Sequence, residues 1–227
     1  MRIVAISDLH GTFPPDIPEC DLLIIAGDVC PDRFEGIRKA SKEPERQLRW
    51  FQNVFVPWVE RQPCKEAVST WGNHDWCGHL QPNAEYGKLT VVSDELYCTE
   101  EANIWLTPWS NQFMDWAFMK HHSELGKIYA QIPEGTDILV SHQPPYGFGD
   151  LYPNLESGKM EHIASSELLY HIERVRPSIV VCGHLHGGHG KYQHGPTTIY
   201  NVSILNEGYQ LYYPVTEFTF GTNPETL

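Results

Sequence analysis

The sequence predicts an α/β fold in which central β-sheets are flanked by helices and antiparallel strands follow toward the C-terminus. Three observations carry this prediction. Short apolar runs recur along the chain without clean alternation, which is typical of strands buried on both faces. Helical patterns lie between some of these runs, and the segment after Lys191 contains further strand patterns. We therefore expect a layered fold whose central strands are covered by helices.

The central strands are predicted from five apolar runs. Most of the runs are rich in Ile, Val and Leu, and each leads into a polar residue and a loop. The runs cover residues 2–6, 22–26, 65–71, 138–140 and 179–182. Runs of this length and composition suit the interior strands of a sheet.

The first helix is predicted from apolar residues that lie three, four and three positions apart. They form one stripe on a helix: Leu48, Phe51, Phe55 and Trp58. Pro44 suits the first turn of this helix, whereas Pro57 is expected to kink or end it.

The second half of the chain predicts two further helices and three strands. One helix is expected to begin with Ser165 or Ser166 as N-cap and to run to about Arg176, where Pro177 closes it. Residues 127–132 form a weaker helical pattern. Strands are expected at residues 198–202, 209–213 and 215–220, with a turn at residues 206–208.

The composition predicts one globular domain over residues 1–227. The chain carries 29 acidic and 16 basic side chains, which gives a net charge of −13. This charge disfavours tight binding to nucleic acid or to anionic membranes. A phosphate substrate would therefore need local positive charge, which metal ions could supply.

The sequence also predicts a cytoplasmic protein. No apolar stretch approaches the ~20 residues of a membrane span, and the first residues turn polar too soon for a signal peptide. Six cysteines are scattered without metal-ribbon or redox spacing, so we expect free thiols. The oligomeric state stays open.

Residues that can bind metal ions open the loops after all five predicted strands. They are Asp8, His10, Asp28, Asn73, His74, His142, His184 and His186. In open α/β sheets, ligands bind outside the carboxyl ends of the strands, so these loops are expected to converge on one site. Mixed carboxylate, imidazole and amide ligands suit metals such as Mn, Fe or Zn. Seven of these residues could hold two ions if one carboxylate bridges them.

Each motif alone also has a structural explanation. A Gly-Asp or Gly-Asn pair is a common turn, and His142 could be a core histidine bonded to a backbone carbonyl. The strongest single motif is Gly183-His184-Leu185-His186, which places two imidazoles in one tight loop. The metal-site interpretation depends on the ordered set, because each motif directly follows a predicted strand.

The ordered set resembles the calcineurin-like metallophosphoesterase family, whose motifs are D-x-H, G-D, G-N-H-D/E, a single H and G-H-x-H. They stand here as Asp8-Leu9-His10, Gly27-Asp28, Gly72-Asn73-His74-Asp75, His142 and Gly183-His184-Leu185-His186. The Gly-Gly-His-Gly after the last motif is similar to the small brain-type metallophosphoesterase-domain proteins. The resemblance implies the layered calcineurin-like phosphoesterase fold.

The resemblance also implies a ligand set and a mechanism. One divalent ion would be held by Asp8, His10, Asp28 and His186, and a second by Asp28, Asn73, His142 and His184, with Asp28 bridging. Manganese is favoured, with Fe, Zn, Ni or Co as alternatives. A hydroxide that bridges the two ions would attack phosphorus, and His74 would protonate the leaving group as general acid. Asp75 is a candidate to orient His74.

Candidate substrate contacts lie in the loops beside the motifs. Arg33 could reach a substrate phosphate or could be a surface arginine. Trp109 and Tyr146, like Trp76 and Trp116, could stack on a nucleobase or lie in the core.

We therefore expect a metal-dependent phosphoesterase that acts on a small phosphodiester such as a cyclic nucleotide. The acidic charge disfavours substrates with several negative charges, and the aromatic residues near the motifs favour a flat group on the substrate. The alternatives are a phosphomonoesterase or phosphatase and a catalytically decayed metal-binding scaffold on the same fold.

Overall fold

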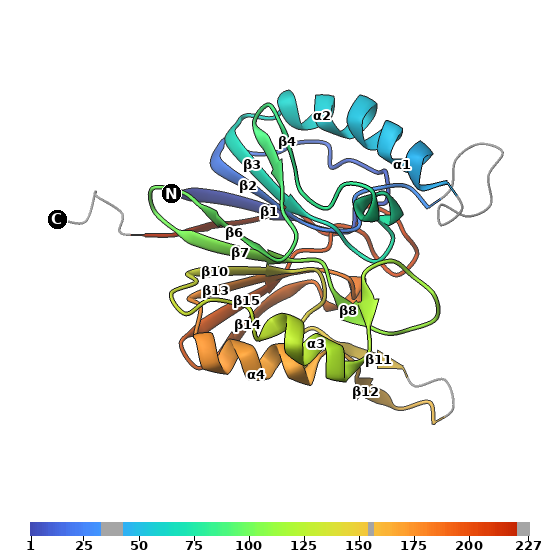
Figure 1. The fold of residues 1–227 in the computed structure, drawn as a ribbon, viewed down its shortest axis with the longest axis vertical. Helices are drawn as coiled ribbons and strands as arrows, with labels where there is room; N and C mark the ends of the chain where they lie inside the picture. Colours follow the sequence, from blue (N-terminus) through green and yellow to red (C-terminus); the bar gives the residue numbers. More distant parts are fainter. Residues whose placement is uncertain (33–42, 154–156, 222–227) are drawn as a thin grey trace.

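Two six-stranded sheets stack face to face in the computed structural model, which describes residues 1–32, 43–153 and 157–221 (Figure 1). In the first sheet, the strand order is β16-β1-β2-β3-β5-β4. Its strands are β1 (Arg2–Ile6), β2 (Cys20–Ala26), β3 (Cys64–Thr70), β4 (Ala84–Tyr86), β5 (Leu89–Val91) and β16 (Thr216–Thr219). The strands β1, β2, β3 and β5 run parallel, while β16 and β4 pair antiparallel at the two edges.

The second sheet repeats this plan with the order β14-β15-β13-β10-β7-β6. Its strands are β6 (Glu95–Cys98), β7 (Asn103–Thr107), β10 (Ile138–Ser141), β13 (Ile179–Cys182), β14 (Gly190–His194) and β15 (Thr197–Asn201). The four central strands are parallel, and β14 and β6 are antiparallel edges. Antiparallel strands are therefore present toward the C-terminus, as predicted. The strand β14 pairs with β15, and β16 pairs with β1 of the first sheet.

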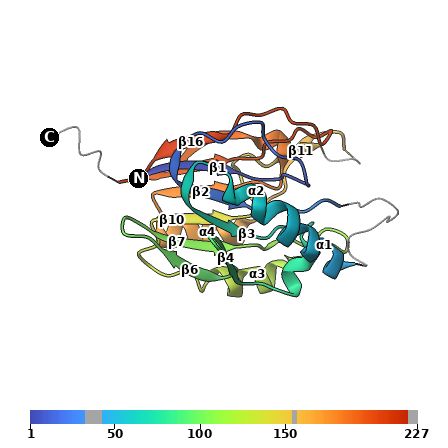
Figure 2. The same cartoon turned by 90° about the horizontal axis from the view of Figure 1, so that it is seen from above.

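The apolar runs are continuous because both faces of each central strand are buried. In β1, Ile3 and Ala5 face the second sheet, where they pack with Ile138 and Val181. The alternate residues of the first sheet pack under one helical segment, and those of the second sheet pack under two helices (Figures 1 and 2). The result is a helix–sheet–sheet–helix sandwich.

The helical segment over the first sheet does not end at Pro57. It consists of α1 (Pro44–Trp50), a π-helical turn (Phe51–Phe55) and α2 (Val56–Glu60). Pro44 lies in the first turn, as predicted, but Pro57 lies in the first turn of α2, directly after the π-helical turn. A π-helical turn changes the register of the backbone hydrogen bonds. A proline that directly follows it therefore interrupts no continuous series of α-helical hydrogen bonds.

The helices over the second sheet are α3 (His122–Tyr129) and α4 (Ser166–Val175). Ser165 caps α4, because its hydroxyl accepts a hydrogen bond from the Leu168 amide at 3.1 Å. The weaker helix was expected at residues 127–132, but α3 begins and ends earlier than this.

The prediction of a strand at residues 209–213 is wrong. That segment makes only an isolated bridge between Leu205 and Leu211, around a turn at Glu207 and Gly208. Among the described residues, nine strands were not predicted. Five of them belong to the two large sheets: β4, β5, β6, β7 and β14. The other four are short: β8 (Ser110–Asn111), β9 (Met119–Lys120), β11 (Leu151–Pro153) and β12 (Met160–His162). These four lie near the carboxyl ends of the second sheet's strands (Figure 1).

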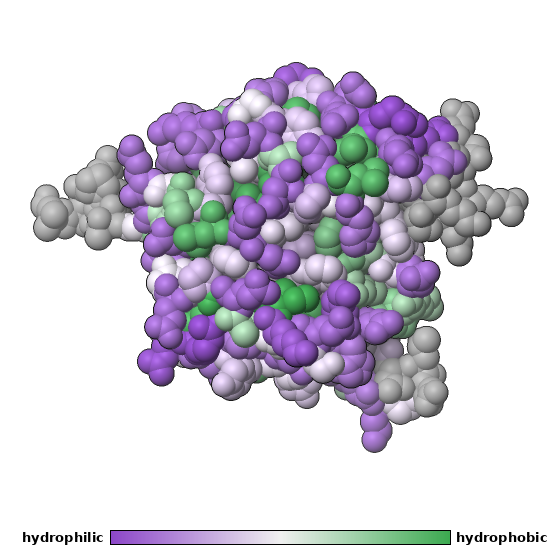
Figure 3. Space-filling view, viewed as in Figure 1, coloured by the Kyte–Doolittle hydropathy of each residue, from purple (hydrophilic) through white to green (hydrophobic). Residues whose placement is uncertain are grey.

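The face seen in Figure 1 is mostly hydrophilic, and its hydrophobic residues form separate small patches (Figure 3). Among the described residues, no helix has the length and apolar character needed to cross a membrane.

Candidate metal centre

The predicted ligand residues converge at one edge of the sandwich, where the parallel strands of both sheets end. Four of them have left-handed backbone, with φ of 58° at Asp8, 43° at His10, 51° at Asp28 and 68° at His184. This conformation is uncommon for residues other than glycine. It costs on the order of 1–3 kcal/mol per residue and clusters at functional sites.

Glycines before the motifs let the loops approach each other closely. Gly27 has a φ of +92°, and a Cβ there would lie 2.5 Å from the Trp71 carbonyl oxygen and 2.7 Å from His142 Nδ1. At Gly72 a Cβ would collide with the Asp28 carboxylate. These positions exclude a side chain because the Trp71 backbone and the candidate ligands Asp28 and His142 fill the space.

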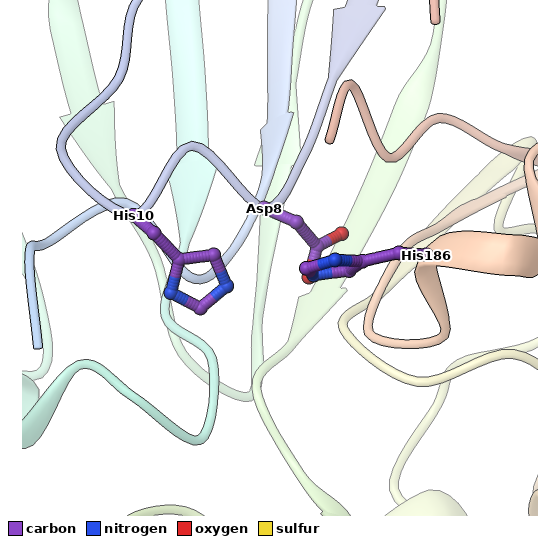
Figure 4. Close-up of side chains that lie close together, drawn as sticks. All are labelled: Asp8, His10 and His186. Carbon is purple, nitrogen blue, oxygen red and sulfur yellow. The ribbon is translucent and has the colours of Figure 1, made fainter. Parts of the chain in front are cut away.

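The first group of candidate ligands is Asp8, His10 and His186 (Figure 4). The Asp8 carboxylate accepts hydrogen bonds from the His184 amide at 2.9 Å and from the Ser203 hydroxyl at 2.6 Å. The ring of His186 donates from Nδ1 to the Asn206 carbonyl at 3.0 Å. This bond leaves His186 Nε2 facing Asp8, at 3.5 Å from its Oδ1.

His10 supplies the clearest sign that this group accepts a cation. Both of its ring nitrogens are buried, and neither has a hydrogen-bond partner. An unsatisfied buried imidazole is costly, and carboxylate oxygens of Asp28 and Asp32 each lie 3.7 Å from one of its nitrogens. Burial lowers the pKa of His10 to about 4, so the ring stays neutral and keeps a lone pair for a metal ion.

The second group of candidate ligands is Asp28, Asn73, His142 and His184. The ring of His142 donates from Nδ1 to the Ala26 carbonyl at 2.9 Å. Its Nε2 lies 2.9 Å from Asn73 Oδ1 and 3.3 Å from Asp28 Oδ2. A lone pair on this nitrogen would face the lone pairs of both oxygens, which is unfavourable unless a proton or a metal ion lies between them.

The electrostatics of the second group also favour a cation. Burial lowers the pKa of His142, but the Asp28 carboxylate outweighs it and raises the pKa to about 9. Burial and the neighbouring His142 lower the pKa of His184 to about 3. His184 Nδ1 lies 2.8 Å from the same Asn73 oxygen. Carboxylate, amide and imidazole donors thus converge on one point, and this donor set fits an intermediate divalent metal.

His74 lies beside both groups, and its ring is held on several sides. Its Nδ1 lies 2.5 Å from Asp32 Oδ1. One face stacks on Trp116 with ring centroids 4.2 Å apart, and the ring meets that of His10 edge-on at 4.7 Å. Burial lowers the pKa of His74, but Asp28 and Asp32 outweigh it and raise the pKa.

Asp75 does not orient His74, contrary to the sequence-based hypothesis. Its fully buried carboxylate accepts hydrogen bonds from the backbone amides of Val29, Cys30 and Gly72 at 3.2, 2.8 and 2.9 Å. Burial raises the pKa of Asp75 to about 7, with a further contribution from Asp28. Asp75 therefore ties the Asp28 loop to the Asn73 loop, and Asp32 takes the place beside His74.

The sequence analysis missed the contact between Asp32 and His74. The signal available for it was a second carboxylate four residues after Asp28, in the same loop. Trp116, one of the aromatic residues that could stack on a nucleobase, stacks on the His74 ring.

Three residues were predicted to contact the substrate, and the two that the structure describes pair with residues outside the ligand groups. The indole of Trp109 donates to Asp94 at 2.6 Å and packs among apolar residues of the core. Tyr146 is exposed and pairs with the His162 ring, with centroids 5.3 Å apart. Arg33 lies outside the described residues.

Comparisons with known proteins agree with the motifs. The calcineurin-like phosphoesterase family model matches residues 1–188. Metallophosphoesterase domain-containing protein 1 of Homo sapiens is 28% identical over 238 residues, which cover 92% of this chain and 68% of that protein. UPF0046 protein T07D4.2 of Caenorhabditis elegans is 34% identical over 248 residues, which cover all of this chain and 61% of that protein.

The fold is also found among solved structures. One crystal structure matches 97% of this chain and 99% of its own, with a TM-score of 0.64 at 13% identity. The motifs, the sandwich and the matched family model lead to one conclusion: the chain belongs to the calcineurin-like phosphoesterase family.

Proposed function

We propose that this protein is a metal-dependent phosphodiesterase that hydrolyses small nucleotide esters, cyclic ones included. The observation that carries the proposal is that the two ligand groups lie beside one histidine, His74, whose ring contacts Asp32 and Trp116. His10, Asp32 and His74 form a third close group of possible ligand atoms, in which we assign His74 to acid catalysis. Family membership supports the broader statement that the chain is a phosphoric ester hydrolase.

Seven side chains would hold two divalent ions, with manganese favoured. Asp8, His10, Asp28 and His186 would hold one ion, and Asp28, Asn73, His142 and His184 would hold the other. When bound, the ions would activate the phosphoryl group as Lewis acids and neutralise its charge. The carbonyls of Ala26 and Asn206 fix which nitrogen of His142 and His186 is free to act as a ligand.

His74 would act as general acid. Its Nδ1 is occupied by Asp32, so its Nε2 is the nitrogen that would deliver a proton to the leaving oxygen. The Asp32 carboxylate favours the protonated ring, and Trp116 and His10 restrict its rotation. A departing alkoxide needs this proton because it is a poor leaving group.

The preference for a diester rests on charge. Among the described residues, no lysine or arginine forms an ion pair with Asp8, Asp28 or Asp32. The whole chain carries a net charge of −13. A diester brings one negative charge to this acidic surface, whereas a monoester brings nearly two. Trp116, beside the proposed acid, favours a flat leaving group.

Paired kinetics on the manganese-loaded protein test the diester preference. We expect a higher kcat/KM for bis-p-nitrophenyl phosphate than for p-nitrophenyl phosphate, and turnover of 2′,3′- or 3′,5′-cyclic nucleotides. A preference for the monoester, with no turnover of any cyclic nucleotide, would overturn the diester assignment but not the metal chemistry.

A substitution of His74 tests the acid. His74→Ala should keep its metal content and lose ~10²–10⁴-fold in turnover of an ester with an alkoxide leaving group. The loss should shrink with p-nitrophenolate, which needs little protonation. His122→Ala, at an exposed histidine of α3, is the matched control. Equal losses for both leaving groups would exclude the general-acid role.

A further inference from the structure

Tyr209 lies against the first ligand group, although the mechanism proposed above does not use it. Its ring centroid is 4.8 Å from that of His10 and 5.1 Å from that of His186. Both contacts are edge-on or strongly tilted, and no metal ligand comes from this part of the chain. The segment was expected to be a strand, but it forms a compact loop instead.

The loop is built around Asn206. The Asn206 side-chain oxygen accepts hydrogen bonds from the amides of Gly208 at 2.9 Å and Gln210 at 3.0 Å. Its carbonyl accepts the Tyr209 amide at 2.9 Å, and the same carbonyl accepts Nδ1 of His186 at 3.0 Å. One residue therefore fixes both the ring of a candidate ligand and the backbone of Tyr209.

The backbone conformation of Tyr209 is energetically unfavourable. Its φ is 58°, a left-handed conformation that is a genuine outlier for a bulky aromatic residue. The side chain belongs to none of the described core clusters, and half of its surface is exposed. Its hydroxyl has no hydrogen-bond partner among the described residues. The turn built on Asn206 therefore sets the Tyr209 backbone, and the ring packs against two candidate ligands instead of the core.

A hydrogen-bond donor at this position would suit the chemistry of the site. Phosphoryl oxygens carry negative charge, and the described ion pairs of the site contain carboxylates and histidines but no lysine or arginine. A tyrosine hydroxyl is protonated near neutral pH and can donate a hydrogen bond.

We propose that Tyr209 is a substrate-binding residue whose hydroxyl donates a hydrogen bond to a non-bridging phosphoryl oxygen. The proposal rests on the proposed phosphoesterase function. It extends that function by adding a phosphate contact from the loop after the last parallel strand. The ring would lie along His10 and His186, and the strained backbone would hold it there before the substrate arrives.

The test compares Tyr209→Phe with Tyr212→Phe in the full-length, manganese-loaded protein. Tyr209→Phe removes only the hydroxyl, while Tyr212 is an exposed tyrosine three residues away and serves as the control. A hydrogen bond to a charged group contributes about 1.5–3 kcal/mol, which is about 10- to 150-fold in binding. We expect Tyr209→Phe to weaken inorganic phosphate binding, measured by calorimetry, and kcat/KM for bis-p-nitrophenyl phosphate by about this factor. Metal content and melting temperature should not change.

Two results would overturn the proposal. One is a Tyr209→Phe variant that binds phosphate and turns over substrate like the wild type. The other is a variant that loses metal or stability, because the hydroxyl would then act on the fold and not on the substrate. If the wild type hydrolyses no ester, the proposed function fails. The phosphate affinities of the two variants would still decide the role of Tyr209.

Discussion

Asp32 and Asp75 lie close to the same histidine, but they have different partners and should respond differently to substitution. Asp32→Asn keeps an oxygen beside His74 Nδ1 and removes the charge that favours the protonated ring. We expect turnover of an alkoxide-leaving ester to fall by roughly 10-fold or more, less than for His74→Ala. Metal content, measured by elemental analysis, should stay at the wild-type level. A loss of bound metal would show that Asp32 acts as a ligand and not as a partner of the acid.

Asp75→Asn should act on stability. The carboxylate accepts three backbone amides, and an asparagine NH₂ group would face at least one of them. Because the site is fully buried, we expect the free energy of unfolding to fall by about 1–3 kcal/mol in a urea titration. An unchanged urea midpoint together with a large loss of turnover would instead favour a direct catalytic role for Asp75.

At the scale of single residues, the sequence indicated the ligand types but not their partners. The convergence of these candidate ligands could be predicted because they directly follow the ends of strands, where topology brings loops together. The contacts of Asp32, Trp116 and Tyr209 depend on loop conformations that have no periodic sequence signal. Asp75 was misassigned because its neighbour in sequence is His74, while its carboxylate turns toward the Asp28 loop.

At the scale of elements, the turn after β13 tolerates no side chain at Gly183. A Cβ there would collide with the Asp8 carboxylate and the Ser7 hydroxyl. Gly183→Ala should therefore displace Asp8, lower the metal content of the purified protein and reduce its melting temperature. Gly126→Ala is the control, because this glycine lies in α3 and a Cβ there would meet nothing closer than 3.7 Å. Normal metal content in Gly183→Ala would mean that the first ligand group can shift without loss of binding.

The elements themselves were predicted to different degrees. Five of the eight interior strands, β1, β2, β3, β10 and β13, could be predicted because burial on both faces leaves continuous apolar runs. The interior strands β5 and β7 were not predicted. The π-helical turn before Pro57 and the two-residue strands β8 and β9 could not be predicted, since their hydrogen bonds depend on tertiary contacts. The segment 209–213 has β-propensity, but the turn built on Asn206 prevents it from pairing as a strand.

At the scale of the whole molecule, metal removal should destabilise the fold. An ion that binds only the folded state stabilises it by about 2.7 kcal/mol at one hundred times its dissociation constant. Chelator treatment should therefore lower the melting temperature and abolish turnover, and Mn²⁺ should restore both. Elemental analysis of the restored protein should give two ions per chain. One ion or none in active protein would exclude the dinuclear assignment.

The candidate ligands come from both layers of the sandwich, and this division has a consequence for how the protein matures. The bond from the His184 amide to Asp8 joins residues 176 positions apart, across the two sheets. Residues so far apart in the sequence come together late in folding. Closing a long stretch of chain loses conformational entropy before any contact compensates for the loss. Neither layer alone offers a complete ligand set, so the ions would be captured only after the layers have docked. Metal capture would then be the final step of maturation, and the metal supply of the cell would set the fraction of finished chains that become active.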